Sequence, residues 1–255
     1  MAKLKKPLAV LLIFVLVFPL VLYAPSALAG AGITEDQPPG NTGTPQKTAL
    51  PAQIPAVYIF KQSADAVFLL ETFDINGVSI RTGSGFFITE TGLAVTNLHV
   101  ISNAASATIT LYNGDVYPVR GVHAISEEFN LTIISIDSDE ADWDFLPFAD
   151  SDLIETGNCV YAIGSPLGFI NTMTAGIISN TSREIEGETL IQFTAPISFG
   201  SGGSPLLNTR GQVVGVTSSS YSYGQNLNLA VPINHVKTLQ PGELVTLESL
   251  LDSGE

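Results

Sequence analysis

Two stretches of this sequence carry residue types that could do chemistry. His99 comes shortly after a predicted buried strand at residues 93–96. A histidine there can serve as a base in catalysis, although a single histidine behind a buried strand is more often structural. The second stretch, residues 199–208, reads FGSGGSPLLN and combines three glycines with two serines. Serine becomes a nucleophile only when a neighbouring base activates it, so the role of both stretches depends on the fold that positions them.

Composition limits the kinds of partner that this chain can have. Its 255 residues and 45% hydrophobic content are enough for one two-lobed domain or two small ones. With 24 acidic against 10 basic residues the net charge is −14, which makes nucleic acid and anionic membrane surfaces poor partners. Three scattered histidines and a single cysteine, Cys159, predict no metal site, no cofactor and no intramolecular disulfide.

The N-terminus has the composition of an export signal. Three lysines precede an apolar run at residues 7–23, and small residues follow at 27–29, which is the order found in a secretory signal peptide. We therefore expect residues 1–29 to be a signal peptide or, if uncleaved, a membrane anchor formed by residues 7–23. Without them 7 basic and 24 acidic residues remain, a net charge of about −17. Residues 30–53 predict a flexible linker, and the domain beyond it is expected to be secreted or held in the cell envelope.

Many short strands separated by turn signals predict an all-β fold. A hairpin around Asn76-Gly77 and further strands near residues 85–89, 93–96, 108–112, 116–122 and 131–136 form a first series. A second series covers residues 159–164, 173–179, 190–194, 212–217 and 228–231. Short helices are expected at 56–64 and 233–239, and residues 239–255 are expected to be a disordered acidic tail. This spacing indicates an antiparallel sandwich or barrel rather than alternating strands and helices.

Several sequence blocks resemble the trypsin-like serine proteases of the bacterial HtrA/Deg type. These blocks are GSGFFI, TNLHV at the histidine, YAIGSPLG, TAGIIS, TAPIS, GQVVGV and NLNLAVPI, in family order over residues 67–236. The resemblance implies two antiparallel six-stranded β-barrels, at about 54–145 and 155–238, within a protease domain at 54–238. It also implies an active site between the barrels. We expect no counterpart of the PDZ module that larger members carry.

The resemblance assigns a catalytic triad in which the acid is altered. Family chemistry needs a serine nucleophile, a histidine base and an aspartate that orients the histidine. His99 matches the base, but Asn130 stands where the aspartate is expected, at the start of the strand 131–136. Asparagine cannot offset the charge of an imidazolium, and the same substitution in another protease costs about 10⁴ in kcat. Glu127, Glu128 and Asp115 are candidate substitutes that the sequence alone does not place.

Two alignments are possible at the nucleophile. The match without gaps puts Gly200 on the first family glycine and Gly202 on the serine, and it keeps the following Pro205 and Leu206 in register. The alternative makes Ser201 the nucleophile, but it then places Phe199 on the family glycine and inserts a residue before the proline. We favour the first alignment. A third interpretation treats residues 200–203 as a flexible turn.

The resulting hypothesis is a catalytically defective protease homologue that still binds peptides or partner proteins. Backbone N–H groups of Gly200 and Gly202 would form an oxyanion cradle that holds a carbonyl or carboxylate without cleaving it. The ligand would lie in the cleft between the barrels, with a neutral or small side chain in a pocket walled by residues 195–199 and 217–228. The alternative is an active serine endopeptidase that uses Ser201 with His99.

Overall fold

A computed structural model describes residues 54–138, 142–185, 187–218 and 226–253 of the chain. By its internal contacts the chain divides into Met1–Ala49 and Leu50–Glu255, and every described residue lies in the second unit. The expected signal peptide and the whole of the expected linker lie outside the described residues. Within the described part, no helix is long and apolar enough to cross a membrane.

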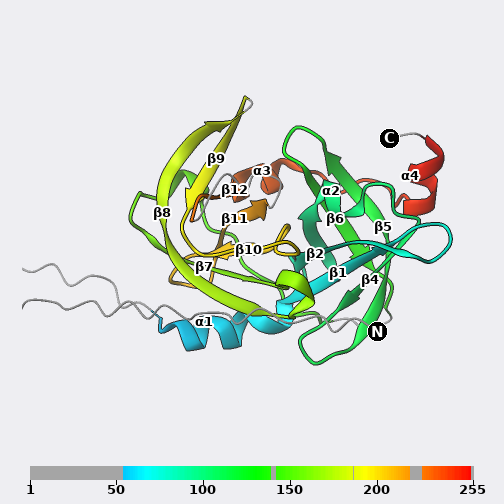
Figure 1. Ribbon diagram of the computed structural model, residues 1–255, viewed down its shortest axis with the longest axis horizontal. Coiled ribbons are helices and arrows are strands. Elements are labelled where there is room, and N and C mark those ends of the chain that lie inside the picture. Colours follow the sequence, from blue (N-terminus) through cyan, green and yellow to red (C-terminus); the bar gives the residue numbers. More distant parts are fainter. Residues whose placement is uncertain (1–53, 139–141, 186, 219–225, 254–255) are drawn as a thin grey trace, which may run out of the picture. The chain divides into compact units, whose positions relative to one another are not determined.

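Within these residues, twelve antiparallel strands close into two six-stranded barrels (Figure 1). The strand order is β1-β2-β3-β6-β5-β4 in the first barrel and β10-β11-β12-β9-β8-β7 in the second. The first barrel comprises β1 Val67–Phe73, β2 Ser79–Phe87, β3 Leu93–Asn97, β4 Ser106–Thr110, β5 Val116–Ser126 and β6 Leu131–Ile136. The second comprises β7 Cys159–Gly164, β8 Thr172–Ile185, β9 Glu188–Phe193, β10 Pro205–Leu207, β11 Val213–Ser218 and β12 Asn228–Pro232. The predicted fold class, a double β-barrel of the trypsin-like type, is confirmed.

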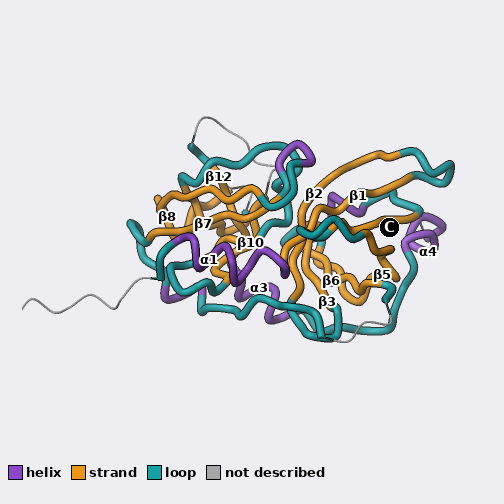
Figure 2. The backbone as a smooth tube through the Cα atoms, turned by 90° about the horizontal axis from the view of Figure 1, so that it is seen from below, coloured by secondary structure: helices purple, strands orange, loops and turns teal. Residues whose placement is uncertain are grey.

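Short helices connect and flank the barrels. They are α1 Ala56–Ser63, α2 Leu98–Ile101, α3 Ile233–Thr238 and α4 Leu247–Ser253, with single 3₁₀ turns at η1 Ala64–Ala66, η2 Ser151–Leu153 and η3 Pro166–Gly168. Figure 2 shows the strands gathered into two groups joined by loops, with α4 beside β5 of the first barrel. The helices predicted at 56–64 and 233–239 are confirmed to within a residue at each end.

A tight turn determines how the first two strands pair. In the β1–β2 hairpin the Asp74 carboxylate accepts hydrogen bonds from the N–H groups of Asn76 and Val78 at 2.9 and 2.8 Å. Gly77 follows with a φ of 76°, a conformation that glycine adopts without steric cost. The bond from Val78 N–H is the main cause of the lowered pKa of Asp74. This turn fixes the register in which Val67 pairs with Phe86.

Three clusters of buried apolar side chains form the core. One belongs to the first barrel and includes Phe68, Phe87 and Ile134. Another belongs to the second barrel and includes Ile178 and Phe193. The largest cluster draws on both barrels and also contains Ile59 of α1, which is fully buried. Because burying a side chain of this size stabilises by roughly 1.5–3 kcal/mol, the shared cluster joins the barrels into one unit.

Two expectations about elements need correction. The C-terminal tail is not disordered throughout, because α4 occupies Leu247–Ser253 and Leu247 is buried against the first barrel. Val245 also pairs with Val122 by two backbone hydrogen bonds of 2.8 and 2.9 Å. Strand β10 has no counterpart among the expected strands, because its three residues begin with a proline and look like the end of a loop.

Candidate active site

The register between β3 and β6 brings His99 beside Asn130. Asn97, the last residue of β3, pairs with Leu131, the first residue of β6. The chain therefore enters α2 at the point where Asn130 precedes β6, and residues 31 positions apart in sequence become neighbours. Sequence reasoning predicted these two residues as partners, and the structure brings them together.

Asn130 makes four hydrogen bonds to residues 97–99. Its backbone carbonyl accepts from Leu98 N–H at 3.0 Å and from Asn97 Nδ2 at 3.1 Å. Its Oδ1 accepts from His99 N–H at 2.8 Å, and its Nδ2 lies 2.8 Å from His99 Nδ1. Asn130 has a φ of 49°, in the left-handed region that asparagine tolerates better than most residues. The side chain is therefore fixed at both of its polar atoms.

This contact pattern determines the orientation of the Asn130 amide. A backbone N–H can only donate, so the amide atom that faces His99 N–H must be the oxygen. The NH₂ group then faces the ring, and because it also can only donate, Nδ1 of His99 must accept. The proton of the neutral imidazole consequently resides on Nε2, which leaves Nε2 without a lone pair to accept a proton.

Burial of the ring is the main cause of a lowered pKa at His99, and the positive charge of Arg81 acts in the same direction. Arg81 Nη1 donates to the carbonyls of His99 and Ser102 at 2.8 and 2.6 Å, which keeps its guanidinium close to α2. An amide oxygen facing the ring would raise the pKa, but the orientation of Asn130 presents Nδ2 instead. The neutral form of His99 is therefore favoured at neutral pH.

The three glycines of the loop at 199–204 differ in backbone conformation. Gly200 and Gly203 have φ values of 89° and 86°, whereas Gly202 is outside the positive-φ region. A Cβ on Gly200 would lie 2.8 Å from the carbonyl oxygen of Ser165, and one on Gly203 would overlap the carbonyl oxygen of Ser84. Gly200 and Gly203 are thus glycine for conformational and packing reasons, and the backbone at Gly202 permits a side chain.

Ser84 of β2 fastens this loop to the first barrel. Its N–H donates to the Gly202 carbonyl at 2.8 Å, and its Oγ donates to the Gly200 carbonyl at 2.7 Å. Oγ also accepts from Ser165 N–H at 2.8 Å, in the segment that leads into η3. Ser84 is fully buried, so these bonds are shielded from water. Sequence reasoning missed Ser84, because a contact across 116 residues leaves no local pattern.

The N–H groups of the loop separate into two sets. Ser201, Gly203 and Ser204 donate to the carbonyls of Ser198, Thr217 and Ser201 at 2.9, 2.9 and 3.1 Å. Among the described residues, no acceptor is paired with Gly200 N–H or Gly202 N–H. These two are the donors that the sequence assigned to an oxyanion cradle.

Ser201 points into its own loop. Its side chain is buried, and its Oγ accepts from Ser198 N–H at 3.3 Å. Thr217 Oγ1 donates to the Ser201 carbonyl at 2.6 Å, which anchors the residue from the other side. The structure therefore fixes Ser201 by its backbone and encloses its hydroxyl.

The three substitute acids considered in the sequence are surface residues. Asp115 lies in the β4–β5 turn, where it is paired with Asn113 at 2.7 Å. Glu127 and Glu128 are exposed between β5 and β6, and Glu128 lies near enough to raise the pKa of His235, whose net pKa is lowered by burial. The position against His99 Nδ1 is taken by Asn130. In the described part of the chain, no group of three or more His, Cys, Asp or Glu side chains could hold a metal ion.

The double barrel and the position of His99 are those of a trypsin-like peptidase domain. Comparison with known proteins agrees, since the sequence profile described as "Trypsin-like peptidase domain" matches residues 83–216, just over half of the chain. The chain belongs to this trypsin-like peptidase family, and its relatives are of the HtrA/DegP type.

The curated relatives are considerably longer than this chain. It is 32% identical over 167 residues to "Putative serine protease HhoA" of Synechocystis, which covers 62% of this chain and 42% of the relative. It is 36% identical over 155 residues to "Probable periplasmic serine endoprotease DegP-like" of Rhizobium meliloti, covering 59% and 30%. It is 32% identical over 192 residues to "Serine protease HTRA1B" of Danio rerio, covering 70% and 39%. The chain thus matches less than half of each relative's length.

Proposed function

We propose that this protein is a trypsin-like protease homologue that binds peptides or partner proteins with little or no hydrolysis. The observation that carries the proposal is the Asn130 amide, whose Nδ2 faces His99 Nδ1. A general base must receive the nucleophile's proton on Nε2, and that nitrogen already carries the ring's proton. A proton on His99 Nε2 prevents the ring from acting as the base for a nucleophile at position 201 or at position 202.

The loop supports the same conclusion. Gly200 and Gly203 have the positive φ values that require glycine, as expected if they frame the nucleophile position at Gly202. We assign Gly202 to that position, where it has no oxygen with which to attack. In the alternative, Ser201 would be the nucleophile, but its hydroxyl is buried and engaged with Ser198.

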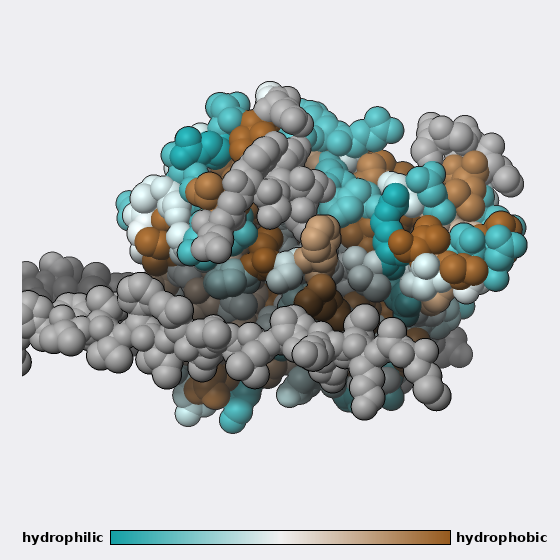
Figure 3. Space-filling model, viewed as in Figure 1, coloured by the Kyte–Doolittle hydropathy of each residue, from teal (hydrophilic) through white to brown (hydrophobic). Residues whose placement is uncertain are grey.

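The binding half of the proposal rests on the N–H groups of Gly200 and Gly202, which are not paired within the described structure. Two N–H groups in one loop can hold a peptide carbonyl or a terminal carboxylate. Three large apolar side chains lie close by and are 69–84% exposed: Leu167, Phe169 and Phe199. The Leu167 N–H donates to the Phe199 carbonyl at 2.8 Å, so these segments adjoin. Figure 3 shows brown, apolar surface near the middle of the face that is seen in Figure 1.

Exposed apolar side chains that lie together on a protein surface often mark a binding site. We propose that it contacts apolar side chains of an extended peptide whose carbonyl occupies the cradle. Part of the expected pocket wall, residues 219–225, lies outside the described residues.

We further propose an extracytoplasmic location, supported by the signal-like residues 1–29 and by relatives named as periplasmic.

Labelling with a fluorophosphonate probe tests the catalytic half. We expect the wild-type protein to remain unlabelled and to leave casein intact. We expect Gly202→Ser to give weak labelling and Gly202→Ser with Asn130→Asp to give strong labelling, because together they restore the nucleophile and the orienting carboxylate. Labelling of the wild type that is lost in Ser201→Ala would establish the active endopeptidase instead. A folded but inert double variant would contradict the assignment of these positions.

Fluorescence anisotropy with extended peptides tests the binding half. Leu-rich and Phe-rich peptides should bind the wild type, and Phe199→Ser should weaken that binding about tenfold. Leu153→Ser is the matched control, because Leu153 is 77% exposed on η2 and belongs to neither the loop nor η3. Equal affinity for apolar and Asp-rich peptides, or equal effects of the two variants, would contradict the proposed contact.

A further inference from the structure

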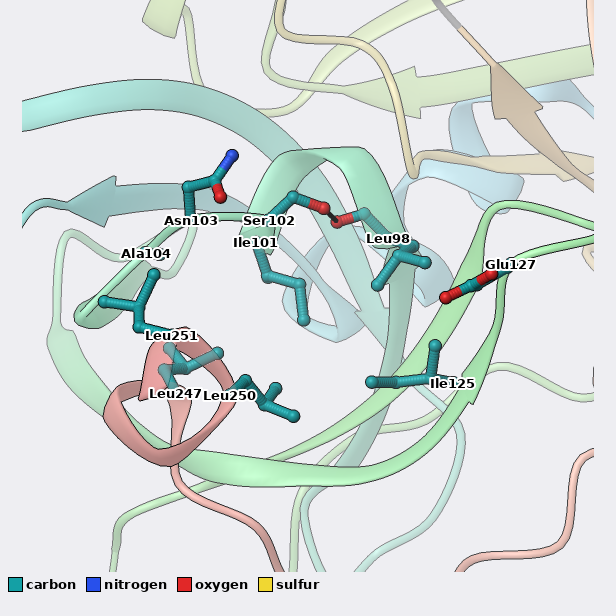
Figure 4. Close-up of a pocket in the computed structure, with 10 residues that line it drawn as sticks. All are labelled: Leu98, Ile101, Ser102, Asn103, Ala104, Ile125, Glu127, Leu247, Leu250 and Leu251. Carbon is teal, nitrogen blue, oxygen red and sulfur yellow. Dashed lines mark hydrogen bonds between the residues drawn. The ribbon is translucent and has the colours of Figure 1, made fainter. Parts of the chain in front are cut away.

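An open pocket of about 460 Å³ lies between α2, the end of β5 and α4 (Figure 4). Most of its lining is aliphatic, with Leu and Ile side chains from all three elements and Ala104 beside them. In Figure 4 the side chains of Leu98, Ile101, Ile125 and Leu250 surround a common space. Its volume is within the usual range for small-molecule sites.

The C-terminal segment builds one wall of this pocket. Gly242 N–H donates to the His123 carbonyl at 2.7 Å, and Val245 pairs with Val122 on β5. These bonds set α4 against the first barrel, where Leu247 is buried and Leu250 is partly buried. The pocket is therefore formed by ordered elements that are tied to the barrel by backbone hydrogen bonds.

The polar residues of the lining are Ser102, Asn103 and Glu127, and the one charge among them indicates which ligand would fit. Ser102 Oγ already donates to the Leu98 carbonyl at 2.9 Å, as the dashed line in Figure 4 shows. Glu127 is the one titratable side chain of the lining, and it is exposed at the edge. A carboxylate there attracts a cation and repels an anion, and the net charge of −14 acts in the same sense.

We propose that this pocket binds a single-chain aliphatic amphiphile with an ammonium head. The aliphatic chain occupies the space between Ile101, Ile125 and Leu250, and the ammonium lies at the Glu127 carboxylate. A fatty acid of the same chain length fits the apolar space but meets a like charge at the edge. This site is separate from the proposed peptide cleft and does not depend on the proposed function.

The pocket is also close to the His99 site through the backbone. Leu98 and Ile101 lie on either side of His99 in the single turn of α2. Asn130 N–H donates to the Glu127 carbonyl at 3.2 Å, so the edge of the pocket and the partner of His99 share a turn. Amide signals of α2 and Asn130 should therefore shift when the pocket is occupied.

Titration calorimetry on the full chain tests this proposal, with dodecylammonium, dodecanol and dodecanoate each kept below its micelle concentration. We expect saturable one-to-one binding of dodecylammonium, at least tenfold tighter than that of dodecanoate. Glu127→Gln should remove most of that preference. Glu128→Gln is the matched control, because it removes the same charge from the neighbouring exposed residue that does not line the pocket.

Two further variants test the apolar part of the site. Ala104→Phe should fill the pocket and abolish binding. Leu250→Asn should weaken binding about tenfold, and it adds no side-chain volume that the core would have to accommodate. Leu153→Asn, on the exposed η2 turn, should leave binding unchanged. Absence of saturable dodecylammonium binding would overturn the proposal. Equal affinity for dodecanoate, equal effects of Glu127→Gln and Glu128→Gln, or binding that survives both pocket variants would also overturn it.

Discussion

At the scale of single residues, Asn130 sets the protonation of His99. Replacing Asn130 by Asp keeps the oxygen that accepts from His99 N–H and puts a second oxygen against Nδ1. The proton should then move from Nε2 to Nδ1, and the carboxylate should raise the pKa of His99, because it stabilises the imidazolium. Nitrogen-15 NMR of the ring measures both effects. Gly202→Ser is the control that should leave the tautomer unchanged, and an Nδ1-protonated wild type would contradict the assigned amide orientation.

Substitution by alanine should lower the free energy of unfolding more at Gly203 than at Gly202. Gly203→Ala forces a non-glycine residue to a φ of 86° and directs a Cβ at the Ser84 carbonyl. The backbone conformation alone costs roughly 1–2 kcal/mol, and the steric overlap adds to it. Gly202→Ala carries no such backbone penalty, so it should lower the free energy of unfolding less. Urea unfolding of the two variants compares them directly, and equal losses would contradict the different roles given to these glycines.

At the scale of elements, the loop depends on Ser84 of the other barrel. Ser84→Ala removes the Oγ that donates to Gly200 and accepts from Ser165. Because both partners are then left buried without that bond, the free energy of unfolding should fall by about 1–3 kcal/mol. Peptide affinity should fall as well, since the cradle loses its anchor. Ser79→Ala on the same strand is the control, because its bond to Glu71 is exposed and should contribute little.

Some strands and site residues could be predicted from the sequence, and others could not. Strands β6 and β7 were predicted to the residue, since each is an apolar run with clear turn signals at both ends. Strand β8 extends well beyond its predicted end, because its outer half is polar. His99, Asn130 and the loop were found through family motifs. Ser84 and the orientation of the Asn130 amide depend on long-range contacts, which no local pattern records.

At the scale of the whole molecule, two partly buried histidines make stability depend on pH. Burial is the largest cause of the lowered pKa at both His99 and His235, and the latter ring stacks on Phe129 with centroids 3.8 Å apart. The unfolded chain therefore binds protons at these sites at a higher pH than the folded chain does. The stability they contribute is fully present above about pH 6.5, the unfolded value, and is lost as the pH falls towards their folded pKa values.

We therefore expect the free energy of unfolding to decrease as the pH falls from 7.5 to 5. Asp74 and Asp150 do not contribute over this range, because their pKa values are lowered and they become protonated only at a lower pH. Urea unfolding at several pH values measures this decrease. The double variant His99→Asn with His235→Asn should have a flatter profile over that range, even if it is less stable at pH 7.5, because its side chains there do not titrate. An unchanged slope in the double variant would assign the pH dependence to the acidic surface rather than to the two partly buried rings.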